Sequence, residues 1–388
     1  MLRKSLLFAV PTMVLAGCGG SEPPQPTMMG GNTDMMMSSG SLGTGPARGS
    51  VAAKQPDLGQ DAVLNGYKIF NNNDPYSKNV EKLGVDPNSD KILAKIGVDK
   101  TLALGFGAVG KDKDKKPFGI PYVVVSGDAP RVAVTFGQPK VSDAGPYPFP
   151  LQMQLETATD PHAIVIDRDG QKLYETSATA ADGAGFKANV GAVWDLRSYS
   201  PRKPGQPSAD SSGLPIFPGL LRYEEVNSQA STQPVAPSQP GLPQPLPQQQ
   251  QLPLDHALRF TLSTVSKGYV TPATASAGTS TDENLPPMGM VLRLKKSYDI
   301  SKFPASAQVV LKALKKYGMI LAEVGPDLTI SGTPDPRWND AEMSTLEKVK
   351  ASDFEVIRLG AMQGLKDDPK AKEAPKVSSP PTAPTAKS

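Results

Sequence analysis

The feature that most limits the fold of this chain is a short alternation of apolar and polar residues, broken repeatedly by glycine or proline. The chain has 36 glycines and 40 prolines among its 388 residues, so strands should be short and helices few. The alternating segments are GIPYVVVSG, RVAVTFG, HAIVIDRDGQKLYE, FKANVGAVWDL, HALRFTLSTV and MGMVLRLKKS, of which we expect the first two to be neighbouring strands. This pattern predicts a mainly β fold, as a β-sandwich or a jelly-roll-like domain.

Helical signals gather at three places, two of them near the C-terminal end. The stretches are 86–97, 304–318 and 339–351. Asn88 or Ser89 is expected to cap the first, Gly318 to end the second, and Asn339 or Asp340 to open the third. Since each stretch lies beside a strand pattern (MILAEVG, LTISGT or FEVIRLG), we predict a small α+β portion at the C-terminal end. No internal repeat is present, which argues against a propeller or a solenoid.

The first eighteen residues, MLRKSLLFAVPTMVLAGC, resemble the signal peptide of a bacterial lipoprotein. Arg3 and Lys4 precede an apolar stretch at 6–16 that is too short to span a bilayer, and small residues precede Cys18. The resemblance implies cleavage before Cys18, diacylation of its thiol, and export to the cell envelope. Gly19, rather than aspartate, follows the cysteine, which favours the outer membrane in a Gram-negative cell. The alternative is an ordinary secretory signal with an incidental cysteine.

Composition divides the chain into segments that can form a core and segments that cannot. We predict a signal peptide at 1–17, a flexible Ser/Gly/Met/Pro tether at 18–58, one folded domain at 59–364 with a Pro/Gln-rich surface excursion at 230–253, and a disordered tail at 365–388. The excursion could instead be a ligand for a partner that binds proline-rich peptides. The tether contains TMMGGNTDMMMSSGS, and methionine thioethers can bind copper or silver. It lacks histidines and regular spacing, so we predict no metal and no cofactor.

The composition also excludes several classes of protein. Cys18 is the only cysteine, so the mature chain has no disulfide and no Cys-His nucleophile. The 41 Lys and Arg residues are interspersed with 38 Asp and Glu residues, and the one basic run, KDKDKK, alternates in sign. We therefore expect no nucleic-acid partner. The sequence has no Walker loop, no G-x-S-x-G elbow and no H-E-x-x-H motif, which disfavours nucleotide-dependent enzymes, serine hydrolases and metzincins.

The two histidines, His162 and His256, both begin the pattern His-Ala-apolar-x-apolar. A two-residue Asp-Gly turn in the first segment would place Ile164 opposite Glu175 and make Glu175 a diagonal neighbour of His162. A three-residue loop would turn Glu175 to the other face. We predict that His162, Glu175 and His256 converge at the rim of one sheet surface as catalytic acid, base or metal ligand. In the alternative, each histidine bonds a backbone carbonyl and only closes the core.

A second group of candidates surrounds the only two tryptophans, each of which lies within two residues of a carboxylate and an arginine. Sugar sites often combine an aromatic face with Asp and Arg side chains that bind hydroxyls. The predicted substrate-binding residues are Trp194, Asp195, Arg197, Arg259, Asp335, Arg337 and Trp338. In HALRFTLSTV, Arg259 lies on the face opposite to Leu258 and Phe260. The alternative is that the tryptophans fill the core and the Asp-Arg pairs brace loops.

The motifs VDPNSDKIL, GAVWDLRS, SADSSGLPIFPGLLRYEEV, DHALRFT, PPMGMVLRLKKSYDIS and SGTPDPRW resemble a family of secreted bacterial and fungal proteins without assigned biochemistry. The resemblance covers 71–356 and implies that this stretch is one folded unit. It implies no catalytic residues. Two departures are the Pro/Gln-rich excursion at a join that is ordinarily short, and Gln206-Pro207 before SAD, where the family has tryptophan. The second weakens any aromatic sugar platform at that loop.

Together these features predict an exported, lipid-anchored cell-envelope protein that binds or cleaves polysaccharide. Its partners would be the membrane, through the lipidated Cys18, and polysaccharide. The alternative is a non-catalytic structural or protein-interaction lipoprotein of the envelope, and the sequence leaves open whether the protein is an enzyme.

Overall fold

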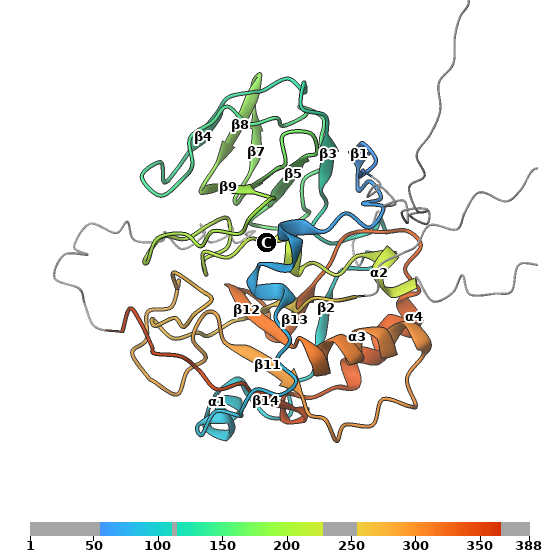
Figure 1. Cartoon of the computed structure of the whole chain (residues 1–388), viewed down its shortest axis with the longest axis vertical. Coiled ribbons are helices and arrows are strands. Elements are labelled where there is room, and N and C mark those ends of the chain that lie inside the picture. The colour runs from blue at the N-terminus through green and yellow to red at the C-terminus, as the bar shows by residue number, and fades with distance from the viewer. Residues whose placement is uncertain (1–54, 111–114, 228–253, 366–388) are drawn as a thin grey trace, which may run out of the picture. The chain divides into compact units, whose positions relative to one another are not determined.

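The computed structural model of the chain describes residues 55–110, 115–227 and 254–365, with the side chains at 71 and 72 left out (Figure 1). Cys18, the methionine cluster, the Pro/Gln-rich excursion and the predicted C-terminal tail beyond 365 lie outside these residues. The chain divides into two units, Met1–Val51 and Ala52–Ser388, and all described residues belong to the second.

Strands in mixed sheets dominate the described residues, and helices are few. A five-stranded sheet has the order β1 (Gly59–Gln60), β3 (Val123–Val125), β5 (Ala163–Asp167), β6 (Lys172–Thr176), β9 (Gly191–Asp195). A three-stranded sheet has the order β4 (Val134–Phe136), β8 (Gly185–Ala188), β7 (Ala180–Asp182). A six-stranded sheet has the order β14 (Phe354–Val356), β11 (Val291–Leu294), β12 (Met319–Val324), β10 (Leu258–Leu262), β13 (Thr329–Ser331), β2 (Ala103–Gly105).

The helices are short and lie mostly in the second half of the chain. The α-helices are α1 (Ser89–Ile96), α2 (Tyr223–Asn227), α3 (Ala305–Lys316) and α4 (Asp340–Met343). The 3-10 helices are η1 (Ile69–Asn72), η2 (Pro75–Ser77), η3 (Phe217–Gly219), η5 (Ser344–Lys348) and η6 (Ala351–Asp353). Among the described residues no helix is both long and apolar enough to cross a membrane.

The three predicted helices are present, and two of them have the expected ends. α1 begins directly after Asn88, and α3 is followed by Gly318 in a left-handed conformation with φ of 74°. The third is shorter than expected: α4 begins after Asn339, whose side chain accepts a hydrogen bond from the Glu342 amide, and the chain then tightens into η5.

The β5–β6 hairpin has the predicted register, but its turn is longer than expected. Ile164 pairs with Glu175 and Ile166 with Leu173, whereas the last pair is Asp167 with Lys172. Four residues therefore form the turn, and the left-handed residue is Gln171, with φ of 51°. Since a four-residue loop has the same parity as the predicted two-residue loop, every side chain keeps its predicted face.

Two other strand predictions are wrong. β3 and β4 lie in different sheets, because β1 and β5 occupy both edges of β3 and leave no edge for β4. The segment FKANVGAVWDL contains two strands: β8 belongs to the three-stranded sheet and β9 to the five-stranded sheet. These two sheets share an apolar cluster, to which β3, β5 and β6 contribute Val123, Val165 and Tyr174 and β8 contributes Phe186.

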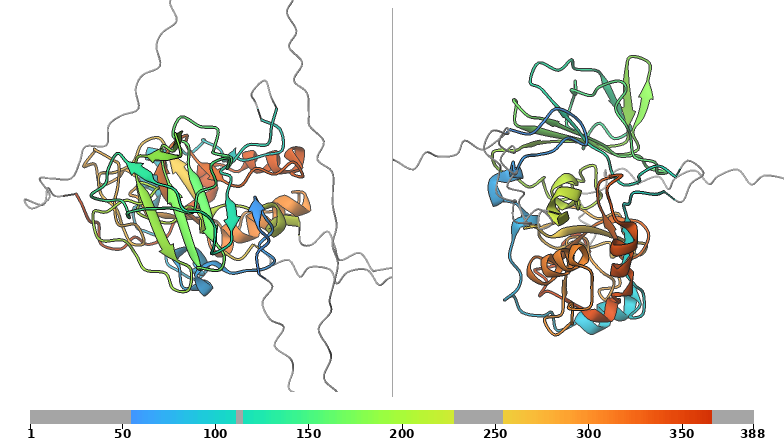
Figure 2. Two further views of the ribbon diagram at one scale, coloured as in Figure 1. Left: turned by 90° about the horizontal axis from the view of Figure 1, so that it is seen from above. Right: turned by 90° about the vertical axis from the view of Figure 1, so that its right-hand side faces the viewer.

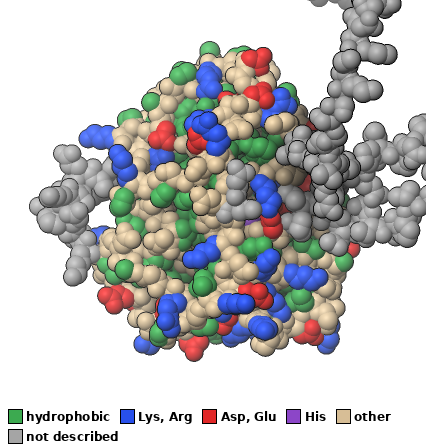
Figure 3. Space-filling view, in the orientation of Figure 1, with side chains coloured by type: hydrophobic (Ala, Val, Ile, Leu, Met, Phe, Trp, Pro, Cys, Tyr) green, Lys and Arg blue, Asp and Glu red, His purple; other side chains and the backbone are tan. Residues whose placement is uncertain are grey.

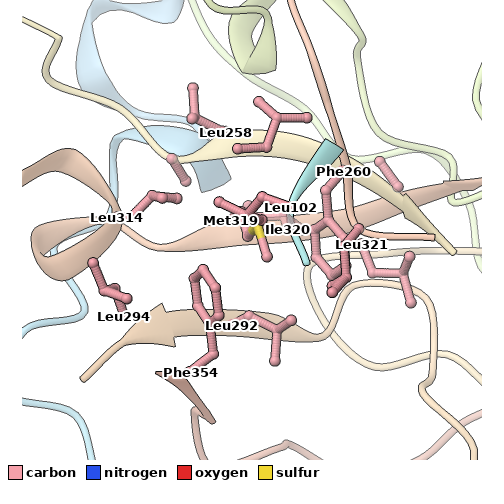
Figure 4. Close-up of a cluster of buried hydrophobic side chains, with 14 of the residues drawn as sticks. Leu102, Leu258, Phe260, Leu292, Leu294, Leu314, Met319, Ile320, Leu321 and Phe354 are labelled. Carbon is pink, nitrogen blue, oxygen red and sulfur yellow. The ribbon is translucent and has the colours of Figure 1, made fainter. Parts of the chain in front are cut away.

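The α+β portion is much larger than predicted. The six-stranded sheet and α3 enclose the most extensive apolar cluster, and Leu258, Phe260 and Leu262 of β10 all face it (Figure 4). The segment HALRFT, which we assigned to the β-rich part, thus forms a central strand of the C-terminal sheet. In Figure 1 and the right-hand view of Figure 2, the green strands lie apart from α1, α3 and the orange strands.

Candidate functional site

A buried ion pair lies between the two larger sheets. Arg259 leaves β10 on the face opposite to the apolar cluster, as alternation predicts, and its Nε and Nη2 donate to the two carboxylate oxygens of Asp210 at 2.7 and 2.6 Å. The exposed fractions of these side chains are 4% and 0%. Arg259 Nη1 also donates to Ser331 Oγ of β13. Arg259, predicted to bind substrate, is therefore committed to internal partners.

Glu175, predicted to be catalytic, is enclosed by hydrogen-bond donors. Its carboxylate accepts from Trp194 Nε1 at 3.0 Å and from the backbone amides of Ile216 and Phe217 at 2.9 and 2.8 Å. Burial raises the pKa of Glu175 to about 7, and the amide hydrogen bonds oppose this rise. The carboxylate thus accepts hydrogen bonds from a backbone turn whose amides at Ile216 and Phe217 are not paired in a sheet.

His162 forms a pair with Glu156, which sequence analysis missed. Nδ1 of the imidazole lies 2.6 Å from Glu156 Oε2, and the backbone amide of His162 donates to the same oxygen at 3.1 Å. Burial lowers the pKa of His162, but the Glu156 carboxylate outweighs this effect and raises it to about 9. Nε2 is buried and has no partner among the described residues. The only sequence signal for this pair was that Glu156, a carboxylate in a loop, lies six residues before His162.

His256 lies in a different cluster. Its Nδ1 is 2.7 Å from the Ala257 carbonyl oxygen, and its Nε2 is 3.0 Å from Glu225 Oε1. Both ring nitrogens lie within hydrogen-bond distance of oxygen atoms, so both are engaged by internal partners. Burial raises the pKa of Glu225, but the charges of Arg222 and His256 outweigh it and lower the pKa. His256 is thus buried, with 7% of its surface exposed, and is enclosed by internal partners.

The prediction that the two histidines share the rim of one sheet surface is therefore wrong. His162 precedes β5 of the five-stranded sheet, whereas His256 precedes β10 of the six-stranded sheet, and each histidine has its own glutamate. The two strands carry the same sequence pattern because each begins at the boundary of a buried face. Identical patterns therefore do not show that two strands belong to one sheet.

The two tryptophans lie in the core. Trp194 and Trp338 each have an exposed fraction of 4%, and their indole N–H groups donate to Glu175 and to the Thr333 carbonyl oxygen. Tyr199 stacks beside Trp194 at 6.0 Å, and Phe106 lies 4.8 Å from Trp338. Neither indole has a free face for a sugar, so the structure follows the alternative in which the tryptophans fill the core.

The remaining predicted binding residues form two surface ion pairs. Arg197 bonds Asp195, which also accepts from Lys172 at 3.0 Å. Arg337 bonds Asp335 and Glu224, each at 2.6 Å, and lies 4.2 Å above the ring of Tyr223. Figure 3 shows basic and acidic side chains interspersed over one face of the molecule, with no field of a single sign.

Glu175, Arg259 and Glu323 all bond to one connecting segment, residues 208–221. Glu175 of β6 binds its amides at Ile216 and Phe217, Asp210 within it binds Arg259 of β10, and Glu323 of β12 accepts from the amide and hydroxyl of Ser211, each at 2.7 Å. Most of the segment is not in a helix or strand. Its buried backbone groups therefore depend on these side chains.

Within the described ranges, no group of three or more His, Cys, Asp or Glu side chains is arranged to hold a metal ion. Comparisons of the chain with family models, with curated proteins and with solved structures find no match.

Proposed function

We propose that this protein acts by binding rather than by catalysis, as an exported, lipid-anchored protein of the cell envelope. The observation that supports this most is that its candidate acid and base groups are buried, and that Glu175 and His256 are engaged by internal partners. Glu175 accepts three N–H donors, both nitrogens of His256 face acceptors, and His162 is 6% exposed beside Glu156. A general acid or base must reach its substrate, whereas all three of these groups are buried.

The test uses the full-length protein with a panel of envelope and plant glycans. We expect retention of a ligand at most, and no new reducing or unsaturated ends. The variants His162→Gln and His256→Gln should lower the melting temperature without changing any glycan product. Release of new ends that His162→Gln abolishes at an unchanged melting temperature would overturn the proposal.

The anchor is supported by the sequence MLRKSLLFAVPTMVLAGC, in which small residues precede Cys18. We expect the full chain to incorporate a labelled fatty acid and to sediment with membranes, and the outer membrane is favoured in a Gram-negative host. Cys18→Ser should lose the label and appear in the soluble fraction, with Ser21→Ala as the control. A Cys18→Ser protein that still incorporates label would contradict the anchor.

Polysaccharide is a second candidate partner, favoured by the exposed cluster around Arg337. This side chain is 52% exposed and is held against the Tyr223 ring by Asp335 and Glu224, so an aromatic edge, a cation and carboxylates lie together at the surface. We expect Arg337→Ala to weaken retention on a glycan array. Arg197→Ala, which removes an equally simple Asp-Arg surface pair, is the control. Equal retention by both variants would argue against this site.

Two structural assignments belong to the same proposal. We interpret the five-stranded and three-stranded sheets as a sandwich-like pair, supported by the apolar cluster that they share. The motifs at 71–356 support membership in the family of secreted bacterial and fungal proteins named above.

A further inference from the structure

A cavity of about 300 Å³ lies over the six-stranded sheet. Val291 of β11 and Ile320 of β12, which are direct cross-strand partners, both line it. Other walls come from the segments 75–83, 270–272 and 357–360. The volume is at the lower end of the range for small-molecule sites, about 300–1,000 Å³.

The lining is apolar with two cations and no carboxylate. Most of the 16 lining residues are aliphatic or aromatic, and the only charged ones are Lys78 and Arg358. Both are exposed, and neither side chain has an ion-pair partner among the residues that the structure describes. Elsewhere in these ranges most arginines bond a carboxylate, as Arg259 and Arg337 do. This cavity therefore carries an uncompensated positive charge beside an apolar surface.

One residue of the cavity wall carries a buried polar atom that lacks a partner. Tyr199 lines it, and the Tyr199 hydroxyl is buried without a hydrogen-bond partner among the described residues. The ring is fixed between Phe70 at 5.5 Å and Trp194 at 6.0 Å. A buried hydroxyl without a partner is costly, and the fixed ring forms one rigid part of the cavity wall.

We propose that this cavity binds a small amphipathic anion, with an apolar body of one short chain or ring against Val291 and Ile320 and an anionic head near Lys78 and Arg358. The two cations favour a head group with a negative charge, and the apolar lining favours an apolar body. The limited volume excludes a long acyl chain. The inference rests on the proposed binding function and gives it a ligand class that the Arg337 cluster does not supply.

The test is calorimetric titration of the full-length protein with octanoate, octan-1-ol and octylammonium, which share a chain length and differ in charge. We expect octanoate to bind, and the alcohol and the cation to bind at least about tenfold more weakly, a difference of about 1.4 kcal/mol. The double variant Lys78→Gln, Arg358→Gln should lose at least tenfold in octanoate affinity. Lys203→Gln, an exposed lysine outside the cavity, should not.

A second variant tests the cavity without touching a charge. Gly360 lines the cavity, and a Cβ at this residue would meet nothing within 4 Å. Gly360→Trp should therefore fold normally and block octanoate, whereas Leu151→Trp, at an exposed site elsewhere, should not. Octanoate affinity that is unchanged in both cavity variants, or equal affinity for all three probes, would overturn the inference. Retained glycan binding in that case would leave the proposed function standing, whereas glycan cleavage would overturn the proposed function and leave the cavity result intact.

Discussion

The His162–Glu156 pair is a buried charge pair whose strength depends on the proton of the imidazole. The pKa of His162 is raised to about 9, whereas that of the unfolded chain is near 6.5. Between these values the folded state binds more protons than the unfolded state, so the free energy of unfolding falls as pH rises. The stabilisation is complete below pH 6.5 and is lost as pH rises through 9.

We predict that the wild-type protein loses on the order of 2–3 kcal/mol of unfolding free energy between pH 6.5 and 9, and that His162→Gln and Glu156→Gln each remove most of this slope. Urea unfolding at a series of pH values measures it. Glu175→Gln is the control, because it should leave this window unchanged. A slope that persists in both His162 and Glu156 variants would contradict the assignment.

Glu175 makes the free energy of unfolding depend on pH in a lower range, between pH 4.5 and 7. Burial raises its pKa to about 7 from an ordinary value of 4.5, so between these values the folded state again holds the extra proton. Stability from this group is therefore present below pH 4.5 and falls as pH rises to 7, opposite to the usual behaviour of a salt-bridged carboxylate.

We predict that Glu175→Gln flattens the stability profile between pH 4.5 and 7, because the amide does not titrate. At pH 5 the variant should lose on the order of 1–3 kcal/mol, because the Gln amide nitrogen would face an N–H donor of Trp194, Ile216 or Phe217. The same urea series measures both effects. His162→Gln should keep the slope in this window, and an unflattened profile in Glu175→Gln would refute the prediction.

At the scale of elements, the β5–β6 turn depends on a close approach. Gly170 donates its amide to Asp167 Oδ1 at 2.7 Å, and a Cβ at residue 170 would lie 2.5 Å from Asp167 Oδ2. Asp167 is 1% exposed and bonds Arg131 at 3.1 Å, so its carboxylate cannot easily move. Glycine is needed here for space and not for a left-handed φ.

Gly170→Ala should therefore cost about 1–3 kcal/mol of unfolding free energy through overpacking. Gly360→Ala is the matched control, because a Cβ there meets no atom within 4 Å and the change should be within about 0.5 kcal/mol. Urea unfolding at neutral pH compares the two. If both alanines have the same small effect, the close approach does not constrain the turn.

At the scale of the whole molecule, the connecting segment 208–221 bonds both the five-stranded and the six-stranded sheet, through side chains and through single backbone hydrogen bonds such as that from Ser212 to Ala322. The Arg259–Asp210 pair is the ion pair among these links, and its side chains are 4% and 0% exposed. Removing one partner leaves an uncompensated charge in the interior, whereas removing both takes out two opposite charges together. The pair therefore should behave as a unit in unfolding experiments.

We predict that Arg259→Met lowers the free energy of unfolding by about 3–5 kcal/mol, and that the double variant Arg259→Met, Asp210→Leu is less destabilised than the sum of the single variants. A double-mutant cycle by urea unfolding measures the coupling. Lys68 and Asp255, a partly exposed pair at 2.7 Å, provide the control cycle, in which the coupling should stay below about 1 kcal/mol. Additive single variants at the buried pair would contradict the proposed role of the segment.

The sequence by itself determined the local features of this protein. Periodicity located most strands, the caps of α1 and α3, and the face of each residue in β5, β6 and β10, because these depend on residues within a few positions. The lipoprotein signal at Cys18 is equally local, although it remains a prediction. For the hairpin, the predicted turn length was wrong but the predicted pairing of Ile164 with Glu175 was correct. Turns of two and of four residues leave each side chain on the same face of the sheet.

Only the tertiary structure decided which elements are neighbours. It separated β3 from β4, placed His162 and His256 on different sheets, buried Trp194 and Trp338, and paired His162 with a loop glutamate. None of these is encoded within one segment, since they depend on which strand edges are free and on how a connecting segment without regular structure satisfies its buried amides. Long-range pairing is chosen by the whole core at once, and a single period in the sequence carries no information about it.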